Sequence, residues 1–386
     1  MISGLGAPED GNIFYPPELK DKLKKAIGKH KIYVPFARPK YTNPKYFIKD
    51  IEELINYNYR LADYLIDDTY DFFIFVISAS DFLGHYGWHW WEDKNNKYHK
   101  IFKDLWRKID EVVGLMVERW GDGYIMVISD HGMGRLKEVF LINKWLQQEG
   151  FLVLKGDDVK LSGINLKRNI KILLRTMFDF ITKLFPTLGD YILFNFVRKM
   201  SKNKRFSQEV DFVKSKAFAL DHCGLGNIYI NAIDEKEREY VKSTIKFKLL
   251  SFFNSIGKNL ELYSNEEVYT GKFLNNLPDL IFMIDSNLVE VNPSIREGKI
   301  IRAPLARNKT GSHRLEGILI VSGNSINQIC KKIDFHKVDL TNVSQIVYIL
   351  MNEMDFQNKT KSQHFSKKLP IEKQEIVKKL EDLGYL

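Results

Sequence analysis

The chain has 386 residues, of which 44% are apolar and 28% are charged, and this composition is typical of folded proteins rather than disordered ones. At roughly 150 residues per domain, the length allows two or three domains, or one large α/β domain with an insertion. No apolar stretch is long enough to span a membrane, the first residues lack a signal-peptide pattern, and the two cysteines, Cys223 and Cys330, exclude a disulfide scaffold and a cysteine-built zinc site. These features predict a cytoplasmic protein of enzyme size.

Short apolar runs with polar ends predict buried strands along the chain. They cover residues 72–80, 124–130, 280–285 and 317–323. Continuous apolar strands are typical of a sheet that helices cover on both faces. Amphipathic helical patterns at residues 48–67 and 98–120 lie on either side of the first run. This alternation predicts an α/β fold with a doubly wound, mostly parallel sheet.

The other segments predict additions to this sheet. A weaker α/β unit with two strands and one long helix indicates a small cap, and a C-terminal helical pattern follows a polar linker. We therefore expect four parts: the first part of the α/β core at residues 1–155, a basic helical insertion at 156–215, the cap at 216–270, and the rest of the core at 271–386.

The net positive charge is concentrated in the expected insertion. From Lys160 to Arg205 there are eleven Lys and Arg residues against two acidic residues, which equals the net charge of +9. Apolar residues recur there at helical spacing, so two interpretations are open. The helices either pack on the protein with a solvated basic face, or they form a basic surface for lipid head groups or an anionic substrate. No nucleic-acid recognition motif accompanies the charge, so we expect no nucleic-acid partner.

Metal-ligating residue types follow two of the expected strands and precede a third. Asp81 and His85 are four residues apart after the first strand, and this spacing places both side chains on one face of a helix. Asp130 and His131 are adjacent after the second strand, and His313 lies in the loop before the last. Carboxylate and imidazole ligands together favour Zn²⁺, Mn²⁺ or Fe over Ca²⁺ or Mg²⁺. Ligands bind beyond the carboxyl ends of strands in open α/β sheets, so these motifs indicate one functional site.

Each motif has a structural alternative. Asp81 could cap a helix while His85 packs in the core, and Asp130 and His131 could form a plain turn. His89 falls one helical turn beyond His85, but its aromatic neighbours favour a packing role. The metal-site hypothesis therefore depends on the three motifs occurring together.

The motifs SDHGMG and TGSHRLEGILIVSG, together with the Asp81 and His85 pair, resemble the alkaline phosphatase superfamily, and in particular its type I phosphodiesterase/nucleotide pyrophosphatase branch. The segments SGLGAPEDGNIFYPPELKDKL, NLPDLIF and IVKKLEDLGYL extend the resemblance over nearly the whole chain. It implies an alkaline-phosphatase-like fold and two divalent metal ions. By resemblance, Asp81, His85 and His313 hold one ion, and Asp130 and His131 hold the other.

The sequence departs from the family pattern at its beginning. Members carry an Asp ligand in a G-L-D-G turn and a Thr or Ser nucleophile, and neither is found in this chain. The resemblance therefore implies a sheet that is incomplete at the N-terminus and one well-formed metal site, with zinc as the first candidate and manganese or iron as alternatives. It also implies that an N-terminal partner polypeptide could supply the missing parts, and that the chain could be inactive alone.

Two functions follow from this pattern. The first is a metal-dependent hydrolase of phosphodiester or pyrophosphate bonds, acting on a small phosphoester or a lipid head group. The alternative is a non-catalytic metal-binding or interaction protein derived from the same fold. Asn143, Trp145 and His222 are candidates for lining the substrate cleft, and Arg314 and Glu316 for orienting the metal ligands. If residues 160–205 meet lipid, the cytoplasmic protein is also peripheral to a membrane.

Overall fold

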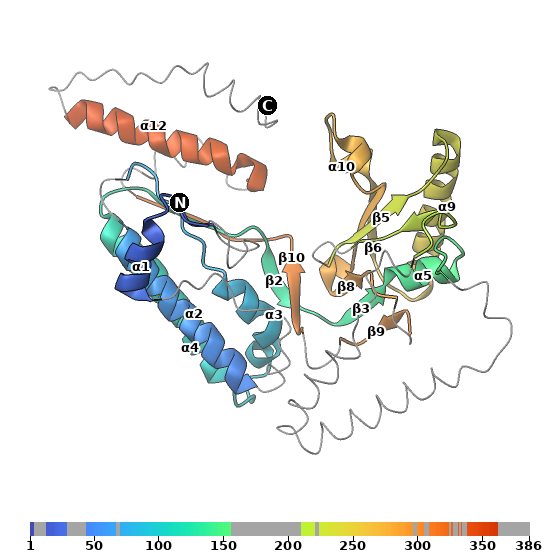
Figure 1. Cartoon of the computed structure of the whole chain (residues 1–386), viewed down its shortest axis with the longest axis horizontal. Helices are drawn as coiled ribbons and strands as arrows, with labels where there is room; N and C mark the ends of the chain where they lie inside the picture. The colour runs from blue at the N-terminus through green and yellow to red at the C-terminus, as the bar shows by residue number, and fades with distance from the viewer. Residues whose placement is uncertain are drawn as a thin grey trace. The chain divides into compact units, whose positions relative to one another are not determined.

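The computed structural model describes residues 1–3, 13–28, 44–66, 70–155, 210–220, 224–295, 299–304, 309–323 and 338–361, with isolated positions 326, 331 and 333. The chain divides into two compact units. The first contains Met1–Gly121 and Ile128–Leu319, and the second contains Asp122–Val127 and Ile320–Leu386 (Figure 1). None of the described helices combines the length and the apolar character that a membrane span requires.

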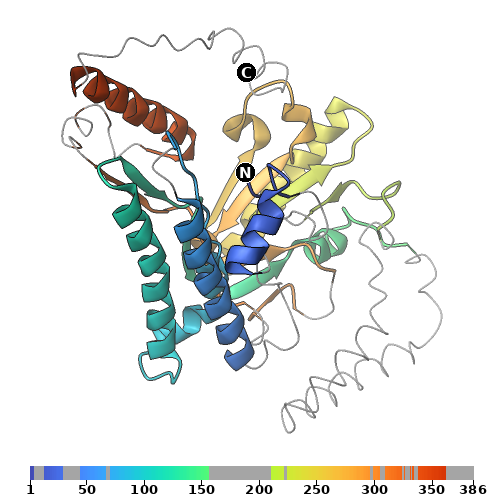
Figure 2. The same ribbon diagram turned by 60° about the vertical axis from the view of Figure 1, so that its left-hand side comes forward.

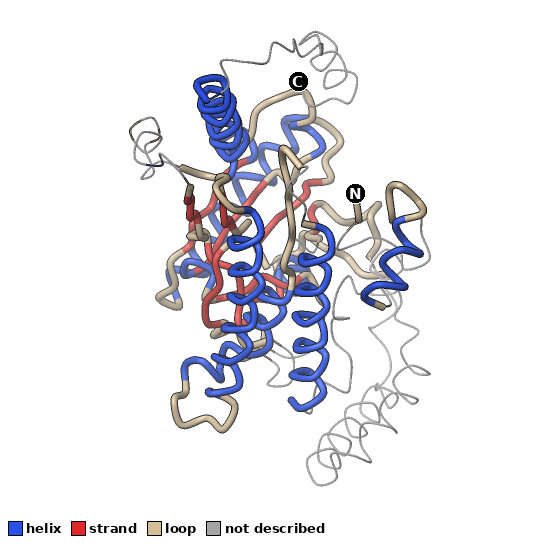
Figure 3. Tube along the Cα trace, turned by 90° about the vertical axis from the view of Figure 1, so that its left-hand side faces the viewer, coloured by secondary structure: helices blue, strands red, loops and turns tan. Residues whose placement is uncertain are grey.

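Four helices begin the first unit: α1 (Leu19–Ile27), α2 (Pro44–Leu65), α3 (Ala79–Glu92) and α4 (His99–Trp120). In α2, apolar residues recur every three or four positions and are buried, as at Ile51, Leu54 and Ile55. They pack against the corresponding stripe of α4, and the long helices lie side by side (Figures 2 and 3). Salt bridges from Lys108 to Glu52 and from Arg119 to Asp63 join α4 to α2 outside this core. The helical patterns at residues 48–67 and 98–120 are thereby confirmed.

A seven-stranded sheet forms the other large part of the first unit. Its strands are β3 (Glu138–Leu141), β4 (Ala217–Phe218), β5 (Gly226–Ile230), β6 (Leu260–Ser264), β7 (Leu280–Ile284), β8 (Val289–Asn292) and β9 (Ile301–Arg302). The order is β4-β5-β7-β8-β3-β9, and β6 also pairs with β7. The helices α5 (Ile142–Gln148) and α9 (Glu235–Ser255) contribute Trp145 and Phe253 to a core in which Phe140 and Phe282 are also buried.

The strands β5 and β6, with α9 between them in sequence, are both antiparallel to β7. The later strand β7 therefore lies between the two strands of a βαβ unit, an arrangement known as a split βαβ. The segment expected to form a cap at residues 216–270 thus shares one sheet with β3, β7 and β8.

The remaining described strands form two small two-stranded sheets. In the first unit, β2 (Gly132–Arg135) pairs antiparallel with β10 (Gly311–Arg314). β1 (Ile125–Ile128) pairs with β11 (Leu319–Ser322), largely within the second unit. The remaining elements are α10 (Asn265–Val268), α12 (Val343–Lys361) and 3₁₀ turns at Leu274–Asn276, Asp285–Asn287 and Leu340–Asn342.

The mixed α/β class is confirmed, but the described strands do not form the expected doubly wound, mostly parallel sheet. In the seven-stranded sheet only β3 and β8 pair in parallel, and its other pairs are antiparallel. The physical reason is that a continuous apolar run indicates a strand buried on both faces, but it does not indicate whether the neighbouring strands are parallel or antiparallel. The run at 280–285 is apolar because β7 is the central strand of an antiparallel group.

The strand expected at residues 72–80 is also not formed in the described structure. Residues 72–77 form neither helix nor strand and pair with no described strand, and α3 already begins at Ala79. Alternate side chains are exposed, with values of 53% for Phe72, 73% for Ile74 and 77% for Val76. The intervening Phe75 and Ile77 pack against the helical core. Side-chain exposure thus alternates along this segment as it does in a strand, although no described strand pairs with it.

Candidate metal centre

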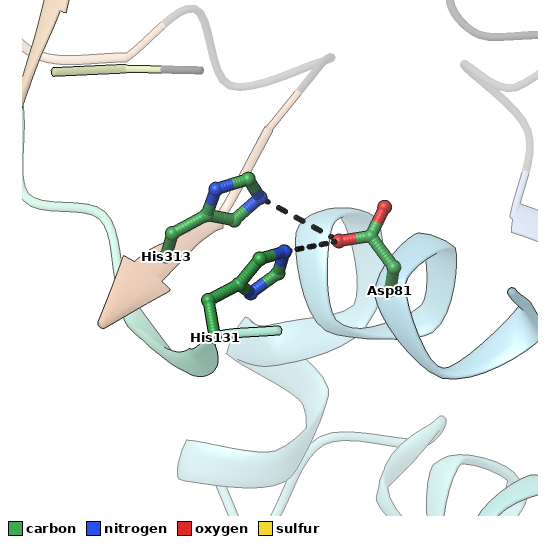
Figure 4. A group of neighbouring side chains, drawn as sticks. All are labelled: Asp81, His131 and His313. Atoms are coloured by element: carbon green, nitrogen blue, oxygen red, sulfur yellow. Dashed lines mark ion pairs between the residues drawn. The ribbon is translucent and has the colours of Figure 1, made fainter. Parts of the chain in front are cut away.

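Four side chains from three separate parts of the chain meet around one carboxylate oxygen. In the first turns of α3, Asp81 and His85 share a helix face, and Asp81 Oδ1 lies 3.2 Å from His85 Nε2. His313 on β10 and His131, which directly precedes β2, place their Nε2 atoms 3.6 Å and 3.8 Å from the same oxygen. Figure 4 shows the imidazoles of His131 and His313 pointing toward Asp81. Asp81, His131 and His313 offer ligand atoms that all lie within 4.8 Å of one another.

The pairing of β2 with β10 explains how these residues meet. His313 is opposite Met133 in the antiparallel register, which brings His131 beside it. The two rings stack with centroids 3.5 Å apart and planes inclined by 19°. A Cβ on Gly132 would lie 1.8 Å from the carbonyl oxygen of Glu316, so this position requires glycine.

The approach of α3 to β10 also depends on glycine. A Cβ on Gly311 would lie 2.3 Å from the carbonyl oxygen of Gly84. This close contact lets His85 Nε2 reach within 3.0 Å of His313 Nε2. The sequence therefore places glycines where α3 and β10 touch.

The hydrogen bonds of the imidazoles direct their free nitrogens toward Asp81. His85 Nδ1 lies 3.0 Å from the carbonyl oxygen of Gly311, and His131 Nδ1 lies 2.9 Å from that of Gly132. Because a carbonyl oxygen only accepts, each Nδ1 carries the proton, and in the neutral ring the Nε2 lone pair faces the cluster. Such a second hydrogen bond is typical of histidines that ligate metals.

The oxygen at the centre of this group has no hydrogen-bond partner. Asp81 Oδ1 is buried and makes no hydrogen bond of acceptable geometry, although three imidazole nitrogens surround it. Four ligands bonded tetrahedrally to zinc at 2.0–2.1 Å lie about 3.3 Å from one another. The separation of 3.0 Å between His85 and His313 and those of 3.2–3.8 Å from Asp81 Oδ1 to the three imidazoles are close to that spacing, so this donor set fits a divalent ion.

Electrostatics favour the protonation states that ligation needs. Burial by itself would raise the pKa of Asp81, but the imidazoles of His313 and His85 outweigh it and hold that pKa well below its usual range. Burial lowers the pKa of His313, and the neighbouring His131 and His85 act in the same direction against the effect of Asp81. Asp81 is therefore an anion and His313 a neutral ligand at neutral pH, which is the state that binds metal.

The other residues singled out in the sequence do not contribute an atom to the group around Asp81 Oδ1. The side chain of Asp130 is 82% exposed, and its Oδ1 lies 3.6 Å from His131 Nε2 on the outer side of the cluster. Asn143 is buried, and its amide bonds to the main chain of Ala219 and to the carbonyl oxygen of Pro293. Trp145 is also buried, in the core of the seven-stranded sheet. His222 and the segment 160–205 are outside the described residues.

Two side chains contact the main chain of His313. Arg314 donates from Nη1 to the carbonyl oxygens of His313 and Asn287, each at 2.8 Å, and its role in orienting a metal ligand stays a prediction. Asn287 donates from Nδ2 to the same His313 carbonyl oxygen at 2.8 Å. Asn287 was not predicted from the sequence, because an asparagine between two strands indicates only a turn.

Comparisons with known proteins agree with the motifs. The family model for type I phosphodiesterase / nucleotide pyrophosphatase matches residues 12–294, which is most of the chain. A search of curated proteins and a search of solved structures each found no match.

Proposed function

The chain belongs to the type I phosphodiesterase / nucleotide pyrophosphatase family of the alkaline phosphatase superfamily, and we propose that it is a metal-dependent hydrolase of phosphodiester or pyrophosphate bonds. The observation that supports this function most directly is the buried, unpartnered Oδ1 of Asp81 with three imidazole nitrogens around it. We propose zinc as the resident ion, with manganese or iron as alternatives, because the donors are one carboxylate and three imidazoles.

The charges of the ligand set suit an anionic substrate. Asp81 contributes one negative charge, and the neutral imidazoles of His85, His131 and His313 contribute none. A divalent ion held by this set retains a net charge of about +1, which attracts a phosphoester. When bound, such an ion stabilises the negative charge that develops on phosphoryl oxygens during the reaction.

The protein's own residues hold the ligands in place. The carbonyl oxygens of Gly311 and Gly132 fix the ring orientations of His85 and His131. Since α3 and β10 touch at Gly84 and Gly311, the two elements keep a fixed spacing. Preorganised ligands of this kind need little rearrangement when metal and substrate arrive.

We also propose a second ion held by Asp130 and His131 as the alternative use of His131 Nε2, because the carboxylate of Asp130 is exposed and 3.6 Å from that nitrogen; the first ion then keeps Asp81, His85 and His313. The complete fold is proposed to be alkaline-phosphatase-like, with a helical insertion at 156–215. The substrate is proposed to be a small phosphoester or a lipid head group, recognised by a cytoplasmic protein with peripheral membrane contact through residues 160–205. A partner polypeptide that completes the site is part of the same proposal.

Metal content and phosphodiester turnover, measured together on the full chain, test this function. We expect the wild-type chain to bind zinc and His313→Ala to lose it. Because the family's nucleophile is not found in this chain, we expect hydrolysis of bis-p-nitrophenyl phosphate by the wild type only when the partner polypeptide is added. His89→Ala is the matched control, because His89 lies one turn beyond His85 on α3 and bonds instead to Thr310 Oγ1. Zinc binding without turnover even in the presence of the partner polypeptide would support the non-catalytic alternative, and no zinc binding would refute the metal site.

A further inference from the structure

The turn between β7 and β8 has an unusual backbone. Asp285, Ser286 and Asn287 have φ values of 48°, 50° and 64°, and they are the only non-glycine residues with positive φ in the described part of the chain. The N–H of Leu288 donates to the carbonyl oxygen of Asp285 at 3.0 Å, which closes a four-residue turn. Two left-handed central residues are characteristic of a type I′ hairpin, in which glycine is common. Here the two central positions hold Ser286 and Asn287.

The turn is anchored on the side of the seven-stranded sheet. The N–H of Asn259, which precedes β6, donates to Asp285 Oδ1 at 2.8 Å, and Lys258 Nζ lies 3.3 Å from Asp285 Oδ2. The Asp285 N–H donates in return to the Asn259 carbonyl oxygen at 2.9 Å. These bonds fix the turn to β6 as well as to its own strands.

On its other side the turn contacts the strand that carries His313. Asn287 is 2% exposed, and its Nδ2 donates to the His313 carbonyl oxygen. Its own carbonyl oxygen accepts from Arg314 Nη1. In the described structure β10 has one strand neighbour, β2, and an isolated two-stranded pair is only marginally stable. The contacts from the turn therefore support β10 in addition to its pairing with β2 and its contact with α3.

The choice of residue at position 287 indicates a role for its side chain. Glycine would adopt the left-handed conformation without steric cost, whereas asparagine also brings an amide whose Oδ1 is buried without a hydrogen bond. The asparagine provides the Nδ2 contact to His313, which glycine cannot make.

We propose that Asn287 is a positioning residue for the metal site, holding the main chain of His313 so that its imidazole keeps its place beside Asp81 and His85. This inference rests on the proposed metal-binding function. The turn joins the seven-stranded sheet to the strand that carries His313, and the Asn287 amide is the side chain of the turn that bonds directly to the His313 main chain. Loss of that amide leaves His313 Nε2 free to move away from atoms that it now approaches within 3.0–3.6 Å.

Asn287→Gly, measured on the full chain, tests this role because it keeps the turn conformation and removes the amide. We expect its zinc affinity, measured by competition with a chelator, to fall roughly 10–100-fold, as is typical when a partner of a metal ligand is lost. The visible absorption of the Co²⁺-loaded protein should change shape, since this spectrum reports ligand geometry. Ser286→Gly is the matched control in the same turn, and it should leave affinity and spectrum unchanged.

The outcomes separate this inference from the proposed function. If the wild type binds zinc and His313→Ala does not, the metal site is supported. The zinc affinity of Asn287→Gly then tests the positioning role by itself. Unchanged affinity in Asn287→Gly, or an equal loss in Ser286→Gly, would overturn the positioning role while leaving the metal site intact. If Asn287→Gly does not fold without metal, Asn287→Asp, which keeps the shape but not the donor, should show the same loss, and wild-type affinity in that variant would overturn the role.

Discussion

The contact between α3 and β10 predicts a large effect from a single added methyl group. A Cβ at position 311 would lie 2.3 Å from the Gly84 carbonyl oxygen, whereas real Cβ atoms essentially never approach other atoms within 3.0 Å. Gly311→Ala must therefore move the two elements apart by at least 0.7 Å at this point. His313 lies two residues along β10, and Asp81 and His85 lie on α3, so the displacement separates the ligands directly.

We expect Gly311→Ala to weaken zinc binding by about 100-fold, because misplacements of about 1 Å in a preorganised site have effects of this size. We also expect the metal-free protein to lose roughly 1–3 kcal/mol of unfolding free energy from overpacking. Zinc competition and urea unfolding of the metal-free chain measure the two effects separately.

Gly114→Ala is the matched control, because it makes the same glycine-to-alanine change at a position without a close contact. Gly114 lies inside α4, and a Cβ there would meet nothing within 4 Å. This change should leave zinc affinity unaltered and stabilise the helix by about 0.5–1 kcal/mol. Wild-type zinc affinity in Gly311→Ala would refute the reasoning, because it would show that the ligand positions do not depend on this contact.

Two further predictions concern the sheet and its ion pairs. Phe253→Ala should lower the unfolding free energy by about 3–5 kcal/mol in urea titrations, because the fully buried ring packs edge-on against Phe140 and its removal leaves a cavity. Burial alone would lower the pKa of Lys242, but Glu239 and Glu266 outweigh it and raise that pKa above its ordinary value. The interaction of Lys242 with the two glutamates therefore stabilises the fold below the ordinary lysine pKa. This stabilisation is lost as the pH rises through the raised pKa of Lys242 in the folded protein. Lys242→Met should lower the melting temperature at pH 8, and a difference from wild type that grows above pH 10.5 instead of shrinking would contradict this sign.

The local features of the site were predictable from sequence, and its assembly was not. The spacing of Asp81 and His85 needs only the geometry of one helix, and α3 places both on one face as expected. The meeting of His131 with His313 depends on the pairing of β2 with β10, which joins residues far apart in the chain. Local patterns carry no information on such pairing, so the assignment of His131 to one ion or the other stays a prediction.

The same limit applies to the fold. The helices α2 and α4 follow from period-3.6 patterns that each segment carries by itself. The direction of β7 follows from its two antiparallel neighbours, and the apolar sequence of the strand is compatible with either direction. Asn143 illustrates the same ambiguity for polar residues. Its buried amide bonds to the main chain, but the sequence alone does not distinguish this role from contact with a substrate.

The unpaired segment at residues 72–77 leads directly into the helix that carries Asp81. In the described structure the backbone amides of residues 72–76 donate to no acceptor, so they should exchange with deuterium almost as fast as in an unfolded chain. A row of free amides with apolar side chains on alternate positions is also a template for strand addition. Self-association at this edge would begin four residues before Asp81, so protein concentration and metal loading are expected to influence each other.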